Sequence, residues 1–411
     1  MRILLASTAS YVPPRGGSTR SNLKWLDALT ANGHVCRVVA STASGTGVEM
    51  QEQGYASPQV HGQIEVGHHG PIEVHSVRHP SQRAALLREQ IHEFHPDWVL
   101  VSSEDLAQVL LREAVSAAPG RVVYLAHTPQ FYPFGPESWN ANREGTEAVR
   151  RCAAVVAISR TMRDYIEKHT GCATTVIHPP MYGEGPYARY ENFGNGYFTI
   201  INPCTVKGIS IFRDLVTHFP QLRFAALPGW GTTESDRATL NLTWLPHARN
   251  IDDVFRRTRV LLVPSLWLEG FGLVVIEAML RGIPVVASAW GGLLESKLGT
   301  RFSEPVHPVE RYEPVFDERS MPRAIIPEQD LTPWISAIEI LAGDERVYRQ
   351  ESEASRAVAH EFVSTVHPGA LEQLLVRLKP AGTKAVTREP LLSNLSPEKR
   401  ALLLNRLRKK S

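Results

Sequence analysis

Short apolar segments alternate with amphipathic segments along most of this chain, and this rhythm is the strongest constraint on its fold. The apolar segments of the first half are RILLAS, VCRVVA, IEVHSV, WVLVS, VVYLAH, AVVAIS and TTVIHP. Amphipathic stretches such as TRSNLKWLDALTANGH and AALLREQIHEFH lie between them. Apolar strands joined by helices are typical of parallel sheets whose two faces are both covered. The pattern therefore predicts an α/β fold with a doubly wound sheet.

The same rhythm starts again after TTVIHPPMYGEGPYARYENFGNGY, a stretch rich in Pro, Gly and Tyr, so we expect the domain boundary near residues 182–196. The segments FTIIN, LRFAAL, LTWLP, VLLVPS and PVVAS follow this stretch. A chain of 411 residues is too long for one compact core. We expect two Rossmann-like domains, at 1–185 and 196–365, with the carboxyl ends of their strands facing across a cleft.

The composition of the chain indicates which partners and which cellular compartment to expect. The hydrophobic content of 43%, the charged content of 21% and the net charge of +2 are those of an ordinary globular protein, without an electrostatic reason to bind nucleic acid. No apolar run reaches the ~18 residues of a membrane span, and no secretory segment is recognisable. The cysteines lack metal-site spacing, so we expect a cytoplasmic protein with reduced thiols at Cys36, Cys152, Cys172 and Cys204.

The segment from Arg143 to Lys168 is fairly basic. Peripheral contact with a membrane therefore stays open, with a solvated helical face as the alternative interpretation.

Two glutamates lie on either side of a glycine-rich turn in residues 264–292, PSLWLEGFGLVVIEAMLRGIPVVASAWGG. The strand VLLVPS should end near the turn, and a helix should begin near Gly272. The free N–H groups of that helix start would form an anion site. Glu269 precedes this site and Glu277 follows it by more than one helical turn, so the two carboxylates would flank a bound phosphate.

A nucleotide sugar meets this requirement, because it has hydroxyl groups at both ends and a diphosphate in the middle. One carboxylate can accept hydrogen bonds from the sugar and the other from the ribose. From spacing alone, helix-capping or solvated glutamates remain the alternative.

These motifs resemble family 4 of the retaining glycosyltransferases, which have the GT-B fold. The stretch PSLWLEGFGLVVIEAMLRGIPVVAS, followed by GG and Glu295, is similar to the EGFG and E-x7-E signature of that family. GGSTRSNLKWLDALTANGHVCRVV resembles its first loop and helix, VVAISRTMRDYI its serine turn, and VIHPP its passage between domains. The resemblance implies sugar transfer from a nucleotide-sugar donor to an acceptor with retention of configuration. It also implies that a helix over 366–380 packs back on the first domain.

The resemblance assigns roles within the donor site. Glu269 would contact the donor sugar, Glu277 would hold the ribose, and Lys207 would neutralise the diphosphate leaving group. His127, in YLAHTPQ, would approach the donor sugar, with a buried and satisfied histidine as the alternative. The backbone around the distal phosphate would come from Gly270, Phe271, Gly272 and Leu273.

The first glycine loop and one departure from the family complete the donor site. Gly16 and Gly17 would let the backbone approach the donor phosphate or the acceptor. The family usually has an arginine five residues before the lysine, where this chain has Asn202. The diphosphate would then lose one cation of its clamp.

The resemblance also implies that no side chain acts as a nucleophile, because the departing phosphate oxygen can take the proton of the acceptor. An Asp-x-Asp motif is absent from the sequence, so we expect no metal and no other cofactor, with Lys207 and the helix start in place of a metal ion. A histidine metal site is not expected either, because supporting carboxylates at suitable spacing are missing near His61, His68, His69, His75 and His79.

The last residues, 381–411, read as a linker and a basic amphipathic tail helix. Ser396 and Pro397 would start this helix, and Leu403, Leu404 and Leu407 would form its apolar stripe. The segment LSPEKRALLLNRL resembles the short helices at the starts of nonribosomal peptide and polyketide synthase modules. It suggests docking to a biosynthetic synthase, with a helix packed on the body as the alternative.

Three other classes of function remain at this stage. A nucleotide-sugar epimerase or a phosphorylase shares the expected architecture. A catalytically silent nucleotide-sugar-binding scaffold is the third. The sequence does not identify the donor base, the sugar or the acceptor, because the loops that select them vary freely among proteins of the same fold.

Overall fold

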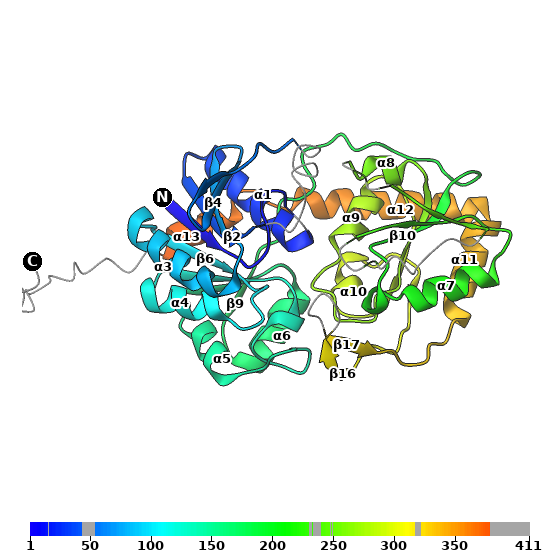
Figure 1. The fold of residues 1–411 in the computed structure, drawn as a ribbon. Coiled ribbons are helices and arrows are strands. Elements are labelled where there is room, and N and C mark those ends of the chain that lie inside the picture. Colours follow the sequence, from blue (N-terminus) through cyan, green and yellow to red (C-terminus); the bar gives the residue numbers. More distant parts are fainter. Residues whose placement is uncertain are drawn as a thin grey trace, which may run out of the picture. The chain divides into compact units, whose positions relative to one another are not determined.

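The computed structural model describes two large sheets, the helices around them and one small hairpin (Figure 1). The described residues are 1–14, 16–42, 54–229, 232, 240–246, 248, 250–316 and 322–378.

The first sheet has the strand order β3-β4-β5-β2-β1-β6-β7-β8-β9. Its strands are β1 (Arg2–Ala6), β2 (Val35–Ser41), β3 (Gln59–His61), β4 (Ile64–His69), β5 (Ile72–Val77), β6 (Trp98–Ser102), β7 (Val122–Ala126), β8 (Ala154–Ala157) and β9 (Thr174–Val176). The connecting helices are α1 (Gly17–Ala31), α3 (Arg83–Phe94), α4 (Val109–Ala117), α5 (Arg143–Arg150) and α6 (Arg160–Thr170), with 3-10 turns η1 (Pro80–Gln82) and η2 (Pro129–Phe131).

One edge of this sheet departs from the parallel pattern. β3 pairs antiparallel with β4, and β4 pairs antiparallel with β5. The sequence did not predict this edge, because β3 is short and fully exposed and gives no apolar run. The central strands β1, β6 and β7 are almost entirely buried, as expected of strands covered on both faces.

The second sheet is parallel throughout, in the order β12-β11-β10-β13-β14-β15. Its strands are β10 (Tyr197–Ile201), β11 (Phe224–Leu227), β12 (Leu242–Trp244), β13 (Thr258–Val263), β14 (Val285–Ser288) and β15 (Ser303–Glu304). Its helices are η3 (Thr205–Lys207), α7 (Ile209–His218), α8 (Asp252–Phe255), α9 (Leu273–Leu280), α10 (Gly292–Ser296) and α11 (Thr332–Gly343). A separate antiparallel hairpin, β16 (Arg311–Phe316) with β17 (Pro322–Ile325), was not predicted.

The expected fold class is confirmed, because the chain forms a mixed α/β structure with two large, mainly parallel sheets. The apolar segments named in the sequence coincide with the strands of both sheets.

Two helices follow the second sheet. α12 (Glu345–Ser364) is capped by Asp344, whose side chain accepts a hydrogen bond from the N–H of Val347 at 3.0 Å. The apolar face of α13 (Ala370–Leu378) lies in the same core cluster as the strands of the first sheet. On α13, Glu372 also accepts a hydrogen bond from Nε2 of His34 at 2.7 Å. The tail 381–411 and its predicted docking helix lie outside the described residues.

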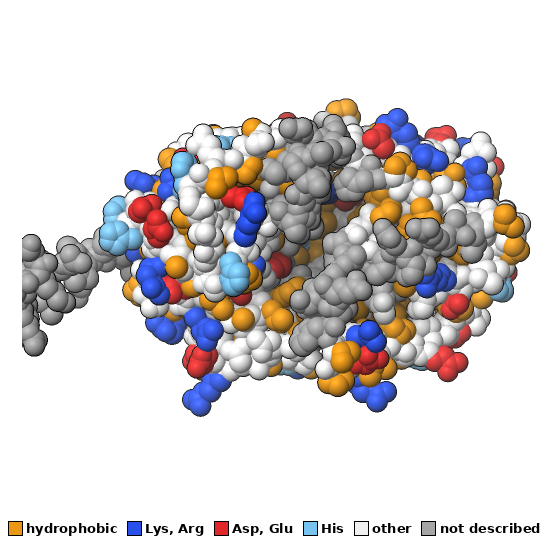
Figure 2. Space-filling model, viewed as in Figure 1, with side chains coloured by type: hydrophobic (Ala, Val, Ile, Leu, Met, Phe, Trp, Pro, Cys, Tyr) orange, Lys and Arg blue, Asp and Glu red, His pale blue; other side chains and the backbone are white. Residues whose placement is uncertain are grey.

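In the part of the chain that the structure describes, no helix is both long and apolar enough to cross a membrane. On the face shown in Figure 2, basic and acidic side chains are interspersed among the described residues, as the small net charge would suggest.

Candidate active site

The carboxyl ends of β10 and β13 meet where the strand order of the second sheet changes direction. Ligands of doubly wound sheets bind outside the strand ends at such a point. Lys207 ends the turn η3 after β10, and Glu269 follows β13. The fold therefore places the side chains of Lys207 and Glu269 at the strand ends where ligands of this fold class bind.

Lys207 and Glu269 form an ion pair in which Lys207 Nζ donates a hydrogen bond to Glu269 Oε1. Ser265 Oγ donates to the same oxygen at 2.6 Å, and the ammonium lies 4.6 Å from the centre of the Trp267 ring. Burial would raise the pKa of Glu269, but the charge of Lys207 and the hydrogen bonds from Lys207, Ser265 and Trp267 outweigh it and lower that pKa. The carboxylate is therefore held ionised beside its cation.

The turn between Glu269 and α9 depends on glycine at two positions. Gly272 has φ of 96°, and a Cβ there would lie 2.7 Å from Leu293 Cδ2. A Cβ on Gly270 would lie 2.1 Å from the carbonyl oxygen of His127. No side chain caps the start of α9 in the described structure, so its first N–H groups can bind an anion.

Phe271 serves this turn as an anchor. Its ring is buried, with its centroid 5.1 Å from that of His178 and 5.5 Å from that of Phe362. The Phe271 side chain is thus occupied by packing and is not available to a ligand.

Glu277 lies on the second turn of α9. Burial raises the pKa of its carboxyl, against the opposing charges of Arg281 and Arg20. Within the described residues no group donates a hydrogen bond to this carboxylate, which leaves its oxygens available to ligand hydroxyls.

His127 follows β7 and lies buried at the carboxyl edge of the first sheet. Its Nε2 is 2.8 Å from Asn22 Oδ1, and its backbone N–H donates to Ser103 Oγ at 3.0 Å. Burial lowers the pKa of the imidazole. Because its carbonyl oxygen lies against Gly270, His127 borders the same turn as Glu269.

The remaining predicted residues lie at different distances from this centre. Gly16 precedes α1 with φ of 91°, and a Cβ on Gly17 would lie 3.6 Å from Leu273 Cδ1, so the first glycine loop meets the start of α9. Asn202 follows β10 with a left-handed φ of 56°, and its Oδ1 lies against Gly229.

The segment after β8 joins the two halves beside the same turn. Ser159 Oγ donates to the carbonyl of Gly270 at 2.6 Å and accepts from the N–H of Met162 at 3.1 Å. Glu295, on α10, accepts hydrogen bonds from the N–H groups of Arg160 and Thr161, both at 3.0 Å. A carboxylate of the second half therefore caps the start of α6 in the first half.

Three residues of this centre were not singled out from the sequence. Ser265 and Trp267 lie in the same stretch as Glu269, PSLWLEGFG. Their closeness to Glu269 in the sequence was the signal that could have identified them. Asn22 lies on the buried face of α1 together with Thr19 and Ser21, so its polarity alone gave no signal in the sequence.

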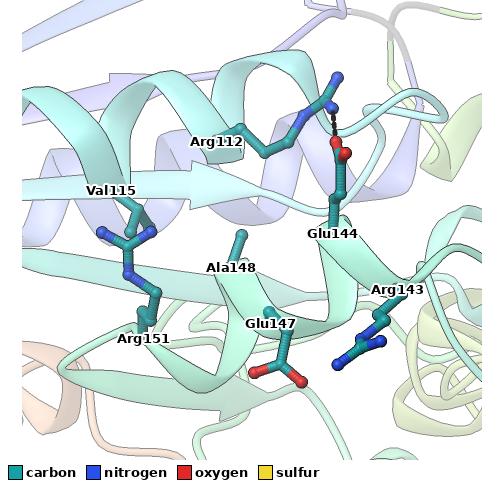
Figure 3. Close-up of a pocket in the computed structure, with 7 residues that line it drawn as sticks. All are labelled: Arg112, Val115, Arg143, Glu144, Glu147, Ala148 and Arg151. Carbon is teal, nitrogen blue, oxygen red and sulfur yellow. Dashed lines mark hydrogen bonds and ion pairs between the residues drawn. The ribbon is translucent and has the colours of Figure 1, made fainter.

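The pocket drawn in Figure 3 is a different surface feature, between α4 and α5, with a volume of about 370 Å³. Arg112, Arg143 and Arg151 line it together with Glu144 and Glu147, and Arg112 donates to Glu144 at 2.6 Å. Its charges are of both signs and none of the predicted site residues lines it, so it is not the candidate active site. Peripheral membrane contact through this region stays a prediction.

In the described ranges, no group of three or more His, Cys, Asp or Glu side chains is placed to hold a metal ion.

Two family models match the chain. Residues 15–181 match the model described as Glycosyltransferase Family 4, and residues 235–296 match the one described as Glycosyl transferases group 1. These two matches, with the two-sheet fold and the site between the strand ends, support a GT-B glycosyltransferase.

Solved structures with the same fold include several glycosyltransferases. HepE from Anabaena, in complex with UDP and glucose, is 18% identical with a TM-score of 0.63, over 91% of this chain and 99% of that one. A glycosyltransferase from Rickettsia africae is 12% identical with a TM-score of 0.61, over 92% and 98%. WaaG, a glycosyltransferase involved in lipopolysaccharide biosynthesis, is 13% identical with a TM-score of 0.60, over 92% and 99%. No curated protein matches the sequence significantly.

Proposed function

We propose that this chain transfers a sugar from a nucleotide-sugar donor to an acceptor hydroxyl with retention of anomeric configuration and without a metal ion. The observation that carries the proposal is the ion pair between Lys207 and Glu269. It lies where the strand order of the second sheet changes direction, beside a helix start that no side chain caps. A cation and free N–H groups suit a diphosphate, and carboxylates suit sugar hydroxyls.

The residues divide the work as follows. The start of α9 and Lys207 hold the diphosphate, and they stabilise the charge that develops as the bond from sugar carbon to phosphate oxygen breaks. The acceptor oxygen bonds to the same face of that carbon, and its proton passes to the departing phosphate oxygen. Glu269 and His127 contact the sugar, while Glu277 accepts hydrogen bonds from the ribose.

A thermal-shift screen tests donor binding directly. A ligand at 100 times its Kd stabilises the folded state by about 2.7 kcal/mol, so we expect one class among UDP-, GDP-, ADP- and dTDP-sugars to raise the melting temperature. UDP-sugars are the first to test, because the HepE structure holds UDP. The shift should disappear in Glu277→Ala and in Lys207→Ala and persist in the exposed control Glu353→Ala. A shift that survives both site variants would place the donor elsewhere.

Chelation tests metal independence. Turnover with the identified donor should stay the same within error after dialysis against EDTA, because Lys207 and the helix start supply the positive charge. Loss of turnover that magnesium restores would contradict this part of the proposal.

The same assay, run without acceptor or with added phosphate, separates a transferase from an epimerase or a phosphorylase.

The predicted association of the tail with a synthase is tested by deleting residues 385–411. Donor turnover should be unchanged and association with a synthase lost; unchanged association would contradict the docking hypothesis.

A further inference from the structure

A chain of hydrogen bonds ends at His127 and has a fixed direction. It begins at the Glu104 carboxylate, which can only accept, so Ser102 Oγ donates to it. The oxygen of Ser102 then accepts from Asn22 Nδ2 at 3.0 Å, as the hydroxyl oxygen of Tyr11 does at 2.8 Å. With its amide nitrogen committed to these two groups, Asn22 presents Oδ1 to His127.

The direction of the chain decides which ring nitrogen of His127 carries the hydrogen. An amide oxygen only accepts, so the contact of 2.8 Å requires an N–H at Nε2. Burial keeps the ring neutral by lowering its pKa, and a neutral ring has its lone pair on the other nitrogen. Nδ1 is therefore a hydrogen-bond acceptor.

That acceptor has no partner. Nδ1 of His127 is buried, and no described residue donates to it. Buried acceptors in folded proteins are nearly always satisfied, so Nδ1 is available to a donor from outside the protein. The carbonyl oxygen of the same residue lies against Gly270, in the turn that follows Glu269.

We propose that Asn22 is a positioning residue that holds His127 in the tautomer with hydrogen on Nε2, so that Nδ1 accepts a hydrogen bond from a hydroxyl group of the bound sugar. The proposal rests on the proposed function for the identity of the ligand. The tautomer itself follows from this chain's own network and is independent of that function.

Besides Asn22, few groups near the His127 ring can influence which of its nitrogens carries hydrogen. From α1, the Trp25 ring packs on it at a centroid distance of 5.8 Å and carries no charge. From the segment after β6, Ser103 contacts only the backbone, and Glu104 is the charged group whose field acts on the imidazole. Glu104 favours the charged ring but lies behind Ser102, whereas Asn22 contacts Nε2 directly.

Asn22→Asp is the decisive variant, because it keeps the shape of the side chain and introduces a charge at Nε2. A carboxylate in contact with the ring should raise the pKa of His127 by about one to three pH units. The protonated ring has N–H at both nitrogens and no longer accepts at Nδ1. The acid limb of kcat/KM should therefore move to higher pH by about the same amount, with activity retained at alkaline pH.

Ser103→Ala is the matched control, since it removes a hydrogen bond to the backbone of His127 and leaves the ring untouched. Its acid limb should coincide with that of the unchanged protein. If Asn22→Asp also leaves the acid limb in place, the positioning role is wrong.

A measurement on the unchanged protein needs no substrate. Nitrogen-15 NMR of histidine-labelled protein, with His127 assigned by the signal missing in His127→Gln, reports which ring nitrogen carries hydrogen. Hydrogen on Nε2 supports the inference, and hydrogen on Nδ1 overturns it. If the tautomer is as proposed but no nucleotide sugar binds or turns over, the proposed function fails and the network stands.

Discussion

Replacing Lys207 by methionine is expected to lower kcat for sugar transfer by about 10²–10³-fold, the usual effect of removing one group that stabilises developing charge in a transition state. The methionine keeps much of the side-chain volume and its contact with Trp267 but has no charge. The proposed diphosphate site then loses the charge of Lys207, and the Glu269 carboxylate loses its partner. Steady-state kinetics with the donor identified by thermal shift measures the effect.

The loss of Lys207 should also change the titration of Glu269. With the cation present, the pKa of Glu269 is lowered, so the pair contributes stability above the ordinary pKa of a glutamate and loses it as pH falls through the lowered value. Without the cation, burial dominates and raises that pKa. Lys207→Met should therefore lose stability near neutral pH more than in acid, as urea unfolding at several pH values will show.

A control variant and a double variant test this prediction further. Lys24→Met removes an exposed lysine paired with Asp27 at 3.4 Å and should leave kcat unchanged. The double variant Lys207→Met with Glu269→Gln should be more stable than Lys207→Met alone, because it leaves no unpaired buried charge. A Lys207→Met enzyme with nearly full kcat would remove Lys207 from the mechanism.

The fold could be predicted from the sequence because buried parallel strands are continuous apolar runs. Such runs can be recognised in a sequence without any knowledge of tertiary contacts. The antiparallel edge β3–β4 and the hairpin β16–β17 were not predicted for the opposite reason. β3 is exposed, and β16 and β17 lie outside the two large sheets, so none of these strands shows the continuous apolar run of a buried strand.

The sequence named several residues of the candidate site, but it could not predict the contacts between them. Glu269 and Lys207 were named separately, and only the fold shows that they form an ion pair across 62 residues of sequence. Asn22 shows the limit most clearly. Its role depends on Ser102, 80 residues away, and on His127, 105 residues away, and no local pattern contains that information. The roles of these residues in catalysis stay predictions.

Removing the Glu295 carboxylate is expected to lower the free energy of unfolding by about 2–3 kcal/mol, as for other hydrogen bonds to buried charged groups. Its side chain is only 7% exposed, and it accepts from the N–H groups of Arg160 and Thr161 at the start of α6. In Glu295→Ala the first turn of α6 keeps its cap at Ser159 but loses the acceptor for the N–H groups of Arg160 and Thr161 and the negative charge that favours its dipole.

The effect of Glu295 should reach the active-site turn, because Gly292, at the start of α10, donates to the carbonyl of Glu269 at 2.9 Å. Hydrogen exchange measured by mass spectrometry should therefore become faster in two separate peptides of Glu295→Ala, one over residues 160–163 and one over residues 268–273. Glu353→Ala, which removes an exposed carboxylate 3.5 Å from Arg189, should change neither peptide and cost less than about 1 kcal/mol. Faster exchange confined to α6 would mean that the cap stabilises its helix alone, and that the turn carrying Glu269 is held by Ser159 and its own glycines.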